Sequence, residues 1–260
     1  MEKKYILTDD VIDFNSHTLH RIKAVRDFYC VKAGDLGGFI ESEKNLDHDG
    51  NAWVTGDAVV TGDAVVTDSA RVSSAAHVTG AAVVSGAARV SGAAVVSGAA
   101  VVSGDAWVTG AAIVSGDAWV TGDAVVSGAA VVTDSARVSS AAHVTGDAVV
   151  TDSARVSGDA HVTDSAVVSG DAVVSGDARV SGDARIHEPS DIALIKGFGS
   201  EFRATSFFRC VDGLVRCQCG CFYGTVDEFR STVRETHGNS KYAKEYLMIA
   251  DLMELHFKED

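Results

Sequence analysis

Apolar residues recur with a period of six through the middle of the chain. Alanine occupies every sixth position from Ala52 to Ala184, which makes 23 successive positions without a gap. A valine stands two residues after each alanine, from Val54 to Val180, and Ile186 ends the series. Because alternate side chains of an extended chain point to the same side, alanine and valine share one face. Each unit is therefore predicted to be a strand of about four residues, closed by a Gly-Asp, Asp-Ser or Ser-Ala turn.

These units cannot fold one at a time. A strand of four residues with one apolar side is stable only when neighbouring units stack and bury that side in a continuous interior. The chain is therefore predicted to be an all-β solenoid over residues 52–187. Residues 1–51 and 188–260 lack the repeat, and we interpret them as an N-terminal capping module and a small α+β C-terminal domain. A dissimilar unit at each end is expected, since an open solenoid end would pair with other chains.

The C-terminal segment carries signals for both strands and helices. A strand is predicted at 192–195, followed by a hairpin of strands 205–211 and 214–222 that turns at Asp212-Gly213. Thr225 and Glu228 form the sequence of a capping box, so a helix is expected from there to near Gly238. Ser240 is then expected to cap a second helix.

Four of the five cysteines lie within this predicted hairpin. A two-residue turn pairs Val211 with Leu214, which places the four thiols on one face of the sheet. Alternate residues on a strand are about 6.7 Å apart, an awkward spacing for ligands of a single zinc ion unless Gly220 kinks the strand. Buried free thiols under the helices are the favoured interpretation, and a zinc site is the alternative. Its candidate ligands are Cys217, Cys219, Cys221 and His237.

The repeat resembles the hexapeptide repeat of left-handed parallel β-helices, in which three hexapeptides form one triangular coil. The pattern is seen, for instance, at 60–65, and the resemblance implies roughly 7.7 coils for about 23 hexapeptides. The segments around 31–41 and 51–54 resemble the N-terminal module of hexapeptide-repeat proteins common in bacterial genomes and prophages. Phe-Phe-Arg (207–209), Cys-Gly-Cys-Phe (219–222) and Thr-His-Gly (236–238) resemble the C-terminal module of the same prophage-type proteins. The resemblance implies a left-handed β-helix and no settled activity.

Three coil faces follow when the outward positions are sorted every 18 residues. The first face is nearly all aliphatic and is a candidate homo-oligomer interface, for a dimer or a trimer. Its interface residues are Val59, Val95, Ile113, Val131, Val149 and Val167, with His77 and Arg185 among them in the column. The alternative is that β-branched residues simply suit strands.

The second face has residue types favoured at protein-protein hot spots. Its candidate partner-binding residues are Trp53, Arg71, Arg89, Trp107, His143, His161 and Arg179, with Val125 between them. The third face contains Val65, Val83, Val101, Trp119, Arg137, Arg155 and Val173.

The net charge and the number of cysteines limit the partners and the cellular location to be expected. The net charge of −14 argues against direct nucleic-acid binding, because the phosphate backbone requires a basic surface. No apolar run resembles a signal peptide or a membrane span, and an odd number of cysteines fits reduced thiols, so the cytoplasm of a bacterial host cell is expected. Regular aspartates at the coil corners leave mimicry of a polyanion open as a weaker hypothesis.

The sequence therefore predicts a non-catalytic binding scaffold without a cofactor. It would display its outward ladders to a macromolecular partner, and the prophage-type resemblance favours a host protein, including one of a defence system. The alternative is a hexapeptide-repeat acyltransferase with a site between subunits. Against it, the repeat contains no inserted loop, and His77, His143 and His161 occupy outward positions on flat faces.

Overall fold

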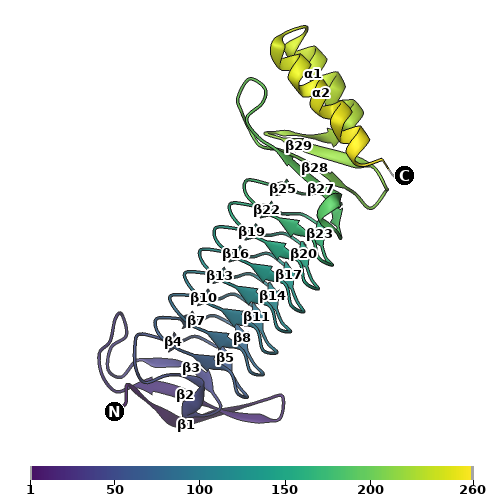
Figure 1. Ribbon diagram of the computed structural model, residues 1–260. Coiled ribbons are helices and arrows are strands. Elements are labelled where there is room, and N and C mark those ends of the chain that lie inside the picture. Colours follow the sequence, from purple (N-terminus) through teal and green to yellow (C-terminus); the bar gives the residue numbers. More distant parts are fainter. Residues whose placement is uncertain (1, 259–260) are drawn as a thin grey trace.

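A parallel β-solenoid forms the body of the protein, with a distinct module at each end (Figure 1). The computed structural model describes residues 2–258. Twenty-three strands of two residues each, β4 to β26, follow one another along the chain and fall into three parallel sheets. Partner strands are 18 residues apart, as in the pairing of Val95 with Ile113. One coil therefore contains three units, as the hexapeptide resemblance implied.

The first face is formed by every third strand. Its strands are β5 (Val59–Val60), β8 (His77–Val78), β11 (Val95–Val96), β14 (Ile113–Val114), β17 (Val131–Val132), β20 (Val149–Val150), β23 (Val167–Val168) and β26 (Arg185–Ile186).

The second face lies along the next side of the prism. Its strands are β4 (Trp53–Val54), β7 (Arg71–Val72), β10 (Arg89–Val90), β13 (Trp107–Val108), β16 (Val125–Val126), β19 (His143–Val144), β22 (His161–Val162) and β25 (Arg179–Val180).

The third face has one strand fewer. Its strands are β6 (Val65–Val66), β9 (Val83–Val84), β12 (Val101–Val102), β15 (Trp119–Val120), β18 (Arg137–Val138), β21 (Arg155–Val156) and β24 (Val173–Val174).

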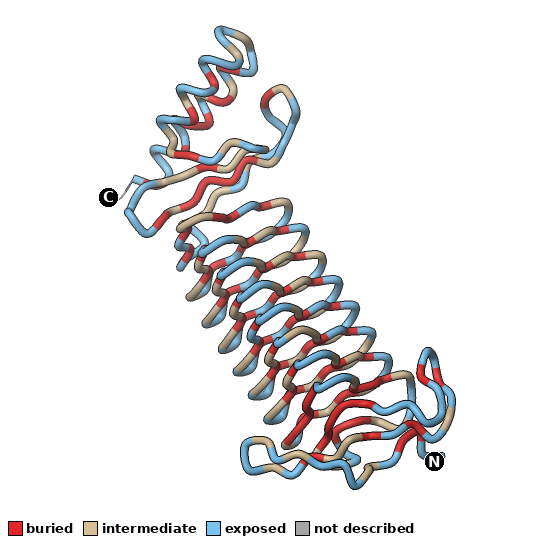
Figure 2. The backbone as a smooth tube through the Cα atoms, turned by 180° about the vertical axis from the view of Figure 1, so that it is seen from behind, coloured by how far each residue is buried: buried red, intermediate tan, exposed pale blue. Residues whose placement is uncertain are grey.

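The repeated alanines and valines fill the interior. The alanine at every sixth position from Ala52 to Ala184 is at most 1% exposed, and the second residue of every strand from β4 to β26 is fully buried. Each coil donates backbone hydrogen bonds to the next, as from Val95 N to Ala112 O at 2.9 Å and from Ser97 N to Val114 O at 2.9 Å. In Figure 2 buried residues recur at regular intervals along every coil, between exposed and intermediate ones. The ladder satisfies the backbone, and the small side chains allow the three sheets to approach closely.

The N-terminal module closes one end of the solenoid. β1 (Tyr5–Phe14), β2 (His17–Ala24) and β3 (Leu36–Ile40) are antiparallel neighbours, and a 3-10 turn, η1, covers Glu43–Asn45. Strand β3 then pairs in parallel with β5, so the module extends the first sheet to 11 strands. The first coil is thereby covered instead of presenting an open edge.

The C-terminal domain closes the other end with a sheet and two helices. A 3-10 turn, η2 (Pro189–Asp191), leads into an antiparallel sheet of β27 (Ile192–Ile195), β28 (Thr205–Arg209), β29 (Val215–Cys219) and β30 (Phe222–Thr225). The helices are α1 (Val226–His237) and α2 (Lys241–His256). Thr225 caps α1 with Glu228 as its capping-box partner, Gly238 ends that helix, and Ser240 caps α2, as predicted. Neither helix is long and apolar enough to cross a membrane within the described residues.

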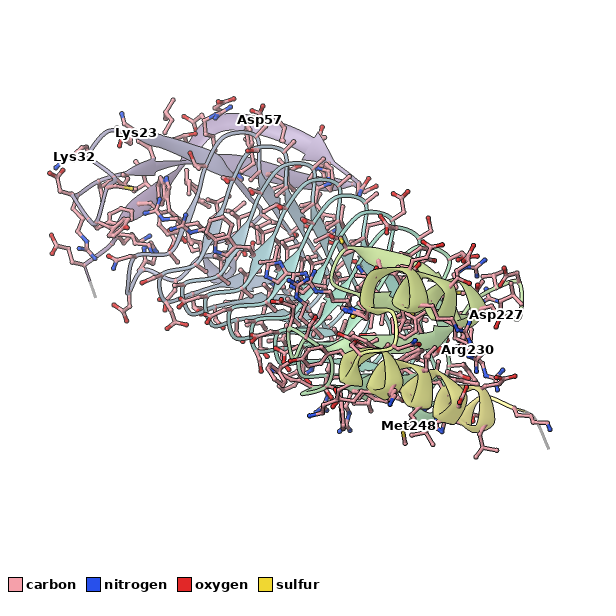
Figure 3. The ribbon with its side chains drawn as sticks, turned by 90° about the horizontal axis from the view of Figure 1, so that it is seen from above. Lys23, Lys32, Asp57, Asp227, Arg230 and Met248 are labelled. Carbon is pink, nitrogen blue, oxygen red and sulfur yellow. The ribbon has the colours of Figure 1, made fainter. Side chains whose placement is uncertain are left out.

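An arginine ties the two helices together. Arg230 of α1 donates to Asp227 of its own helix at 3.0 Å and to Asp251 of α2 at 2.9 Å (Figure 3). The sheet lies between these helices and the last coil of the solenoid. Phe207 packs with Phe229 on the helix side, whereas Phe208 belongs to the core of the solenoid.

The hairpin differs from the predicted two-residue turn. Cys210 N donates to Leu214 O at 3.0 Å, Arg209 pairs with Val215, and the loop contains three residues. The strand also ends at Cys219, where a second tight turn leads into β30. The pairing is thus shifted by one residue, and such a shift moves side chains to the opposite sheet face. The prediction that all four cysteines share one face is therefore wrong.

Candidate binding surface

The second face does not present all of its predicted residues to a partner. Trp53 is only 3% exposed, because its ring packs edge-on against Phe28 at 5.3 Å and against Tyr5 at 6.4 Å between ring centroids. It anchors the N-terminal module on the first coil. Trp53 is therefore a core residue, and its sequence-based assignment to a partner-binding surface is wrong.

Arg71 joins the loop of the N-terminal module to this face. Its guanidinium lies 4.6 Å from the ring centroid of Tyr29, and its Nη2 donates to the Sγ of Cys30 at 3.1 Å. Tyr29 is 72% exposed and holds a φ of 44°. A non-glycine residue in this left-handed region is uncommon, so the loop presents an aromatic ring in a strained backbone conformation.

Arg89 and Trp107 form the central pair of the second face. The Arg89 guanidinium lies 5.0 Å from the Trp107 ring centroid, a cation–π distance, and Trp107 is 46% exposed. Together with Arg71 these residues line a groove of about 240 Å³, in which the other residues are Trp53, Thr55, Ser73, Ser91 and Thr109. The groove thus combines an aromatic ring, guanidinium groups and hydroxyls on one face of the solenoid.

Two histidines follow toward the C-terminal end. The rings of His143 and His161 stack with a centroid distance of 4.7 Å and an interplanar angle of 10°. The pKa of His161 is lowered, first by its burial and then by the positive charges of His143 and Arg179. The neutral form of His161 is favoured for the same reasons.

Arg179 lies where the second face meets the C-terminal domain. Its backbone N donates to Ser206 Oγ at 2.8 Å, which fixes the last coil against β28. Arg179 also lines a pocket of about 430 Å³ with Lys196 and Arg203. The same pocket contains Asp177, which pairs with Lys196.

The arginines on the flat faces of the solenoid lie apart from the acidic side chains. Within residues 2–258, none of them forms an ion pair with a carboxylate, although the chain is strongly acidic. These residues are Arg71, Arg89, Arg137, Arg155, Arg179 and Arg185. The aspartates lie at the coil corners instead, so cations and anions are separated on this surface.

The first face is partly covered by the N-terminal module. Val59 is 2% exposed and packs with Leu19 and Phe39, so it cannot contribute to an oligomer interface as predicted. His77 contacts Phe14 at a ring-centroid distance of 4.8 Å. Beyond this cover the aliphatic stripe stays accessible: Ile113 is 39% exposed, and half-buried positions are Val95, Val131, Val149 and Val167.

The cysteines of the C-terminal domain are divided between two sheet faces. Cys210 belongs to the solenoid core, whereas Cys217 is fully buried under the helices, where burial raises the pKa of its thiol. Cys219 accepts a hydrogen bond from Thr205 Oγ1 at 3.1 Å and lines a pocket of about 260 Å³ with Cys221 and His237. No group of three or more metal-ligating side chains with suitable geometry occurs between residues 2 and 258. The favoured interpretation of buried thiols under the helices fits Cys217, whereas Cys210 is buried on the solenoid side of the sheet and Cys221 is exposed.

Three residues beside the second face were missed by sequence reasoning. Tyr29, Lys196 and Arg203 lie outside the repeat, in loops of the two terminal modules. Tyr29 contacts Arg71, and Lys196 and Arg203 line one pocket with Arg179, so segments far apart in the chain meet where a local pattern gives no signal. The positive φ of Tyr29 is likewise visible only in the structure.

A comparison with known families agrees with the repeat architecture. The family model of the YdcK β-solenoid repeat matches residues 154–170 and 172–188, which lie in the last coils. No curated protein matches the chain. Both the coil geometry and this match identify the chain as a β-solenoid repeat protein.

Proposed function

We propose that this protein is a non-catalytic binding scaffold, whose solenoid displays ladders of outward side chains to a macromolecular partner. The resemblance of its terminal modules to prophage-type proteins favours a host protein in the bacterial cytoplasm as that partner. Prophage origin and an anti-defence role are parts of this proposal.

One observation carries the proposal: two tryptophans stand nearly half exposed on flat sheet faces, each beside an arginine. Trp107 is 46% exposed next to Arg89, and Trp119 is 47% exposed at 5.5 Å from the Arg137 guanidinium. Tryptophan and arginine are the residue types that most often dominate binding energy at protein interfaces. The regular sheet holds them at fixed spacings without a loop that must be ordered on binding.

The histidines on the same surface favour binding over acid-base catalysis. A general base needs a partner that orients its ring and a substrate within hydrogen-bond reach. His143 and His161 stack on each other, and neither ring hydrogen-bonds to a described side chain or backbone group. An acyltransferase site between subunits would need these groups from a neighbouring copy.

Native mass spectrometry of the full-length protein, purified from its own bacterial host, tests the proposal. We expect a co-purified protein at fixed stoichiometry, and its loss from the variant Arg89→Ser/Trp107→Ser. Val173→Ser on the third face is the control and should retain the partner. A protein that carries no macromolecule but binds acetyl-CoA in a calorimetric titration would overturn the scaffold function in favour of the acyltransferase.

A further inference from the structure

We infer that the second face, between Tyr29 at one end and Arg203 at the other, is a docking surface for an extended acidic segment of a protein partner. This inference rests on the proposed scaffold function and adds the face, its limits and the chemistry of the partner.

Loops of both terminal modules flank this one face. Residues 25–35 form a loop beside the first coils, and residues 196–204 form a loop beyond β25, on the same side of the molecule (Figure 1). The two ends of the second loop, Lys196 and Arg203, line one pocket with Arg179 of β25. The view from behind shows both loops on the opposite side of the picture, in agreement (Figure 2). Each loop presents an exposed aromatic residue with a positive φ: Tyr29 at 44° and Phe202 at 52°, which are 72% and 63% exposed. Residues with strained backbone conformations cluster at functional sites.

The surface between the loops is rich in cations that the protein itself does not neutralise. Arg89 and Arg179 form no ion pair within residues 2–258, whereas Arg203 at the end of the face pairs with the exposed Glu201 at 3.7 Å. Arg89 and Arg179 are five coils apart, which is about 24 Å at the ~4.8 Å spacing of paired strands. An extended peptide rises about 3.3 Å per residue, so roughly seven residues connect the two guanidinium groups.

The shifted pKa of His161 also indicates a positive electrostatic potential on this face. After burial, the positive charges of His143 and Arg179 lower the pKa of His161. Asp159 opposes this effect, but its contribution to the pKa is the smallest of the four. A carboxylate bound near the two rings would therefore stabilise the protonated form and raise that pKa.

The arrangement favours an acidic polypeptide over a nucleic acid. Asp105, Asp123 and Asp159 follow one edge of the second face, at the turns that precede its strands. A nucleic-acid strand carries a charge on every phosphate and would meet these aspartates as well as the overall charge of −14. A peptide can place a few carboxylates at the arginines and leave uncharged residues at the edge. Ser73, Ser91 and Thr109 in the groove supply hydroxyls for its backbone.

Fluorescence anisotropy with a labelled 14-residue peptide of alternating Glu and Tyr tests the inference on the full-length protein. We expect binding that weakens with added salt, and a dissociation constant at least tenfold higher in Arg89→Ser/Arg179→Ser. The matched control is Arg155→Ser/Arg185→Ser, which removes the same charge from the other two faces and should leave the affinity unchanged. Thermal melting verifies that both variants are folded.

Two further measurements complete the test. NMR titration of the His161 ring should give a higher pKa with the peptide than without it in the wild-type protein. A 14-nucleotide oligothymidylate should bind more weakly than the peptide. Equal loss of affinity in both arginine variants, tighter binding of the oligonucleotide, or no binding of the peptide overturns the inference. A host partner that still co-purifies in those cases leaves the scaffold function intact, so the two failures are distinguishable.

Discussion

The residue after each Thr or Ser of the repeat decides whether the coil can turn. This position has a positive φ in every unit from Gly56 to Gly182, and glycine occupies most of them. Close stacking adds a second constraint, because a Cβ on Gly92 would lie 2.7 Å from the backbone oxygen of Gly110 in the next coil. Aspartate or serine replaces glycine at six of these turns, although L-residues avoid this conformation.

The aspartates at these turns bond to the neighbouring coil. Asp68, Asp152 and Asp164 each accept a hydrogen bond through Oδ2 from the backbone N 18 residues later, at 3.0 to 3.1 Å. This backbone N has no ladder partner of its own at the glycine turns. The carboxylate therefore satisfies a donor that glycine would leave to water, which offsets part of the conformational cost.

Asp152 provides a test of this role. We expect Asp152→Ala to lower the free energy of unfolding by about 2 kcal/mol, because alanine resists the left-handed region and has no acceptor. Asp152→Asn should cost less, since asparagine tolerates this conformation and keeps an acceptor oxygen. Denaturant titration followed by circular dichroism measures both variants. A stability of the alanine variant equal to wild type would contradict the role of the carboxylate.

The location of the inward alanines explains why each repeat unit has a small residue at this position. Every inward alanine is buried at the centre of a narrow prism, where three sheets meet across a short distance. The valines fill the remaining width and suit the extended backbone. A larger residue at an alanine position must displace both neighbouring coils, because close-packed interiors have no spare volume.

Ala118 in the middle of the solenoid is a direct probe of this packing. We expect Ala118→Leu to destabilise the protein by about 1 to 3 kcal/mol through overpacking. Ala111→Leu adds the same side chain at an exposed turn position and should change stability by no more than about 0.5 kcal/mol. Thermal melting compares the two variants. Equal melting temperatures would show that the interior accommodates the leucine.

The C-terminal hairpin shows how tertiary contacts override a local turn signal. Asp212-Gly213 predicts a two-residue turn, yet Gly213 N bonds to Cys210 O at 3.0 Å in a three-residue loop. Val211 N also bonds to Asp183 O of the last coil at 3.1 Å, and Cys210 bridges to Ala184. These contacts hold Cys210 against the solenoid, so the shifted register is the one that docks the domain.

At the scale of the whole molecule, the first face has a partly accessible aliphatic stripe beyond the N-terminal module. We propose that Val95, Ile113, Val131, Val149 and Val167 form a contact between copies of the chain, now without the covered Val59. Contiguous apolar surface of this kind marks interaction sites in soluble proteins. Its flat geometry suits a symmetric contact of a dimer or a trimer.

Oligomeric state in solution checks this proposal. We expect the wild-type protein to be a dimer or a trimer by light scattering coupled to size exclusion, and Ile113→Lys/Val149→Lys to be a monomer. A buried lysine pair at the contact would carry a large desolvation cost. Val83→Lys/Val101→Lys on the third face is the control and should keep the wild-type mass. A monomeric wild type would contradict the proposal.

The repeat and the capping residues were enough to predict the solenoid, its interior and the two helices. These features depend on contacts at a fixed period or within one helical turn, so Ala52 to Ile186 and Thr225 to Gly238 could be assigned from spacing alone. The tertiary structure decided which outward residues stay accessible. Trp53 and Val59 have the same pattern as Trp107 and Val95, but only they lie under the N-terminal module. Whether a distant segment buries an outward residue depends on how the terminal modules dock. The sequence of a repeat unit gives no sign of that docking.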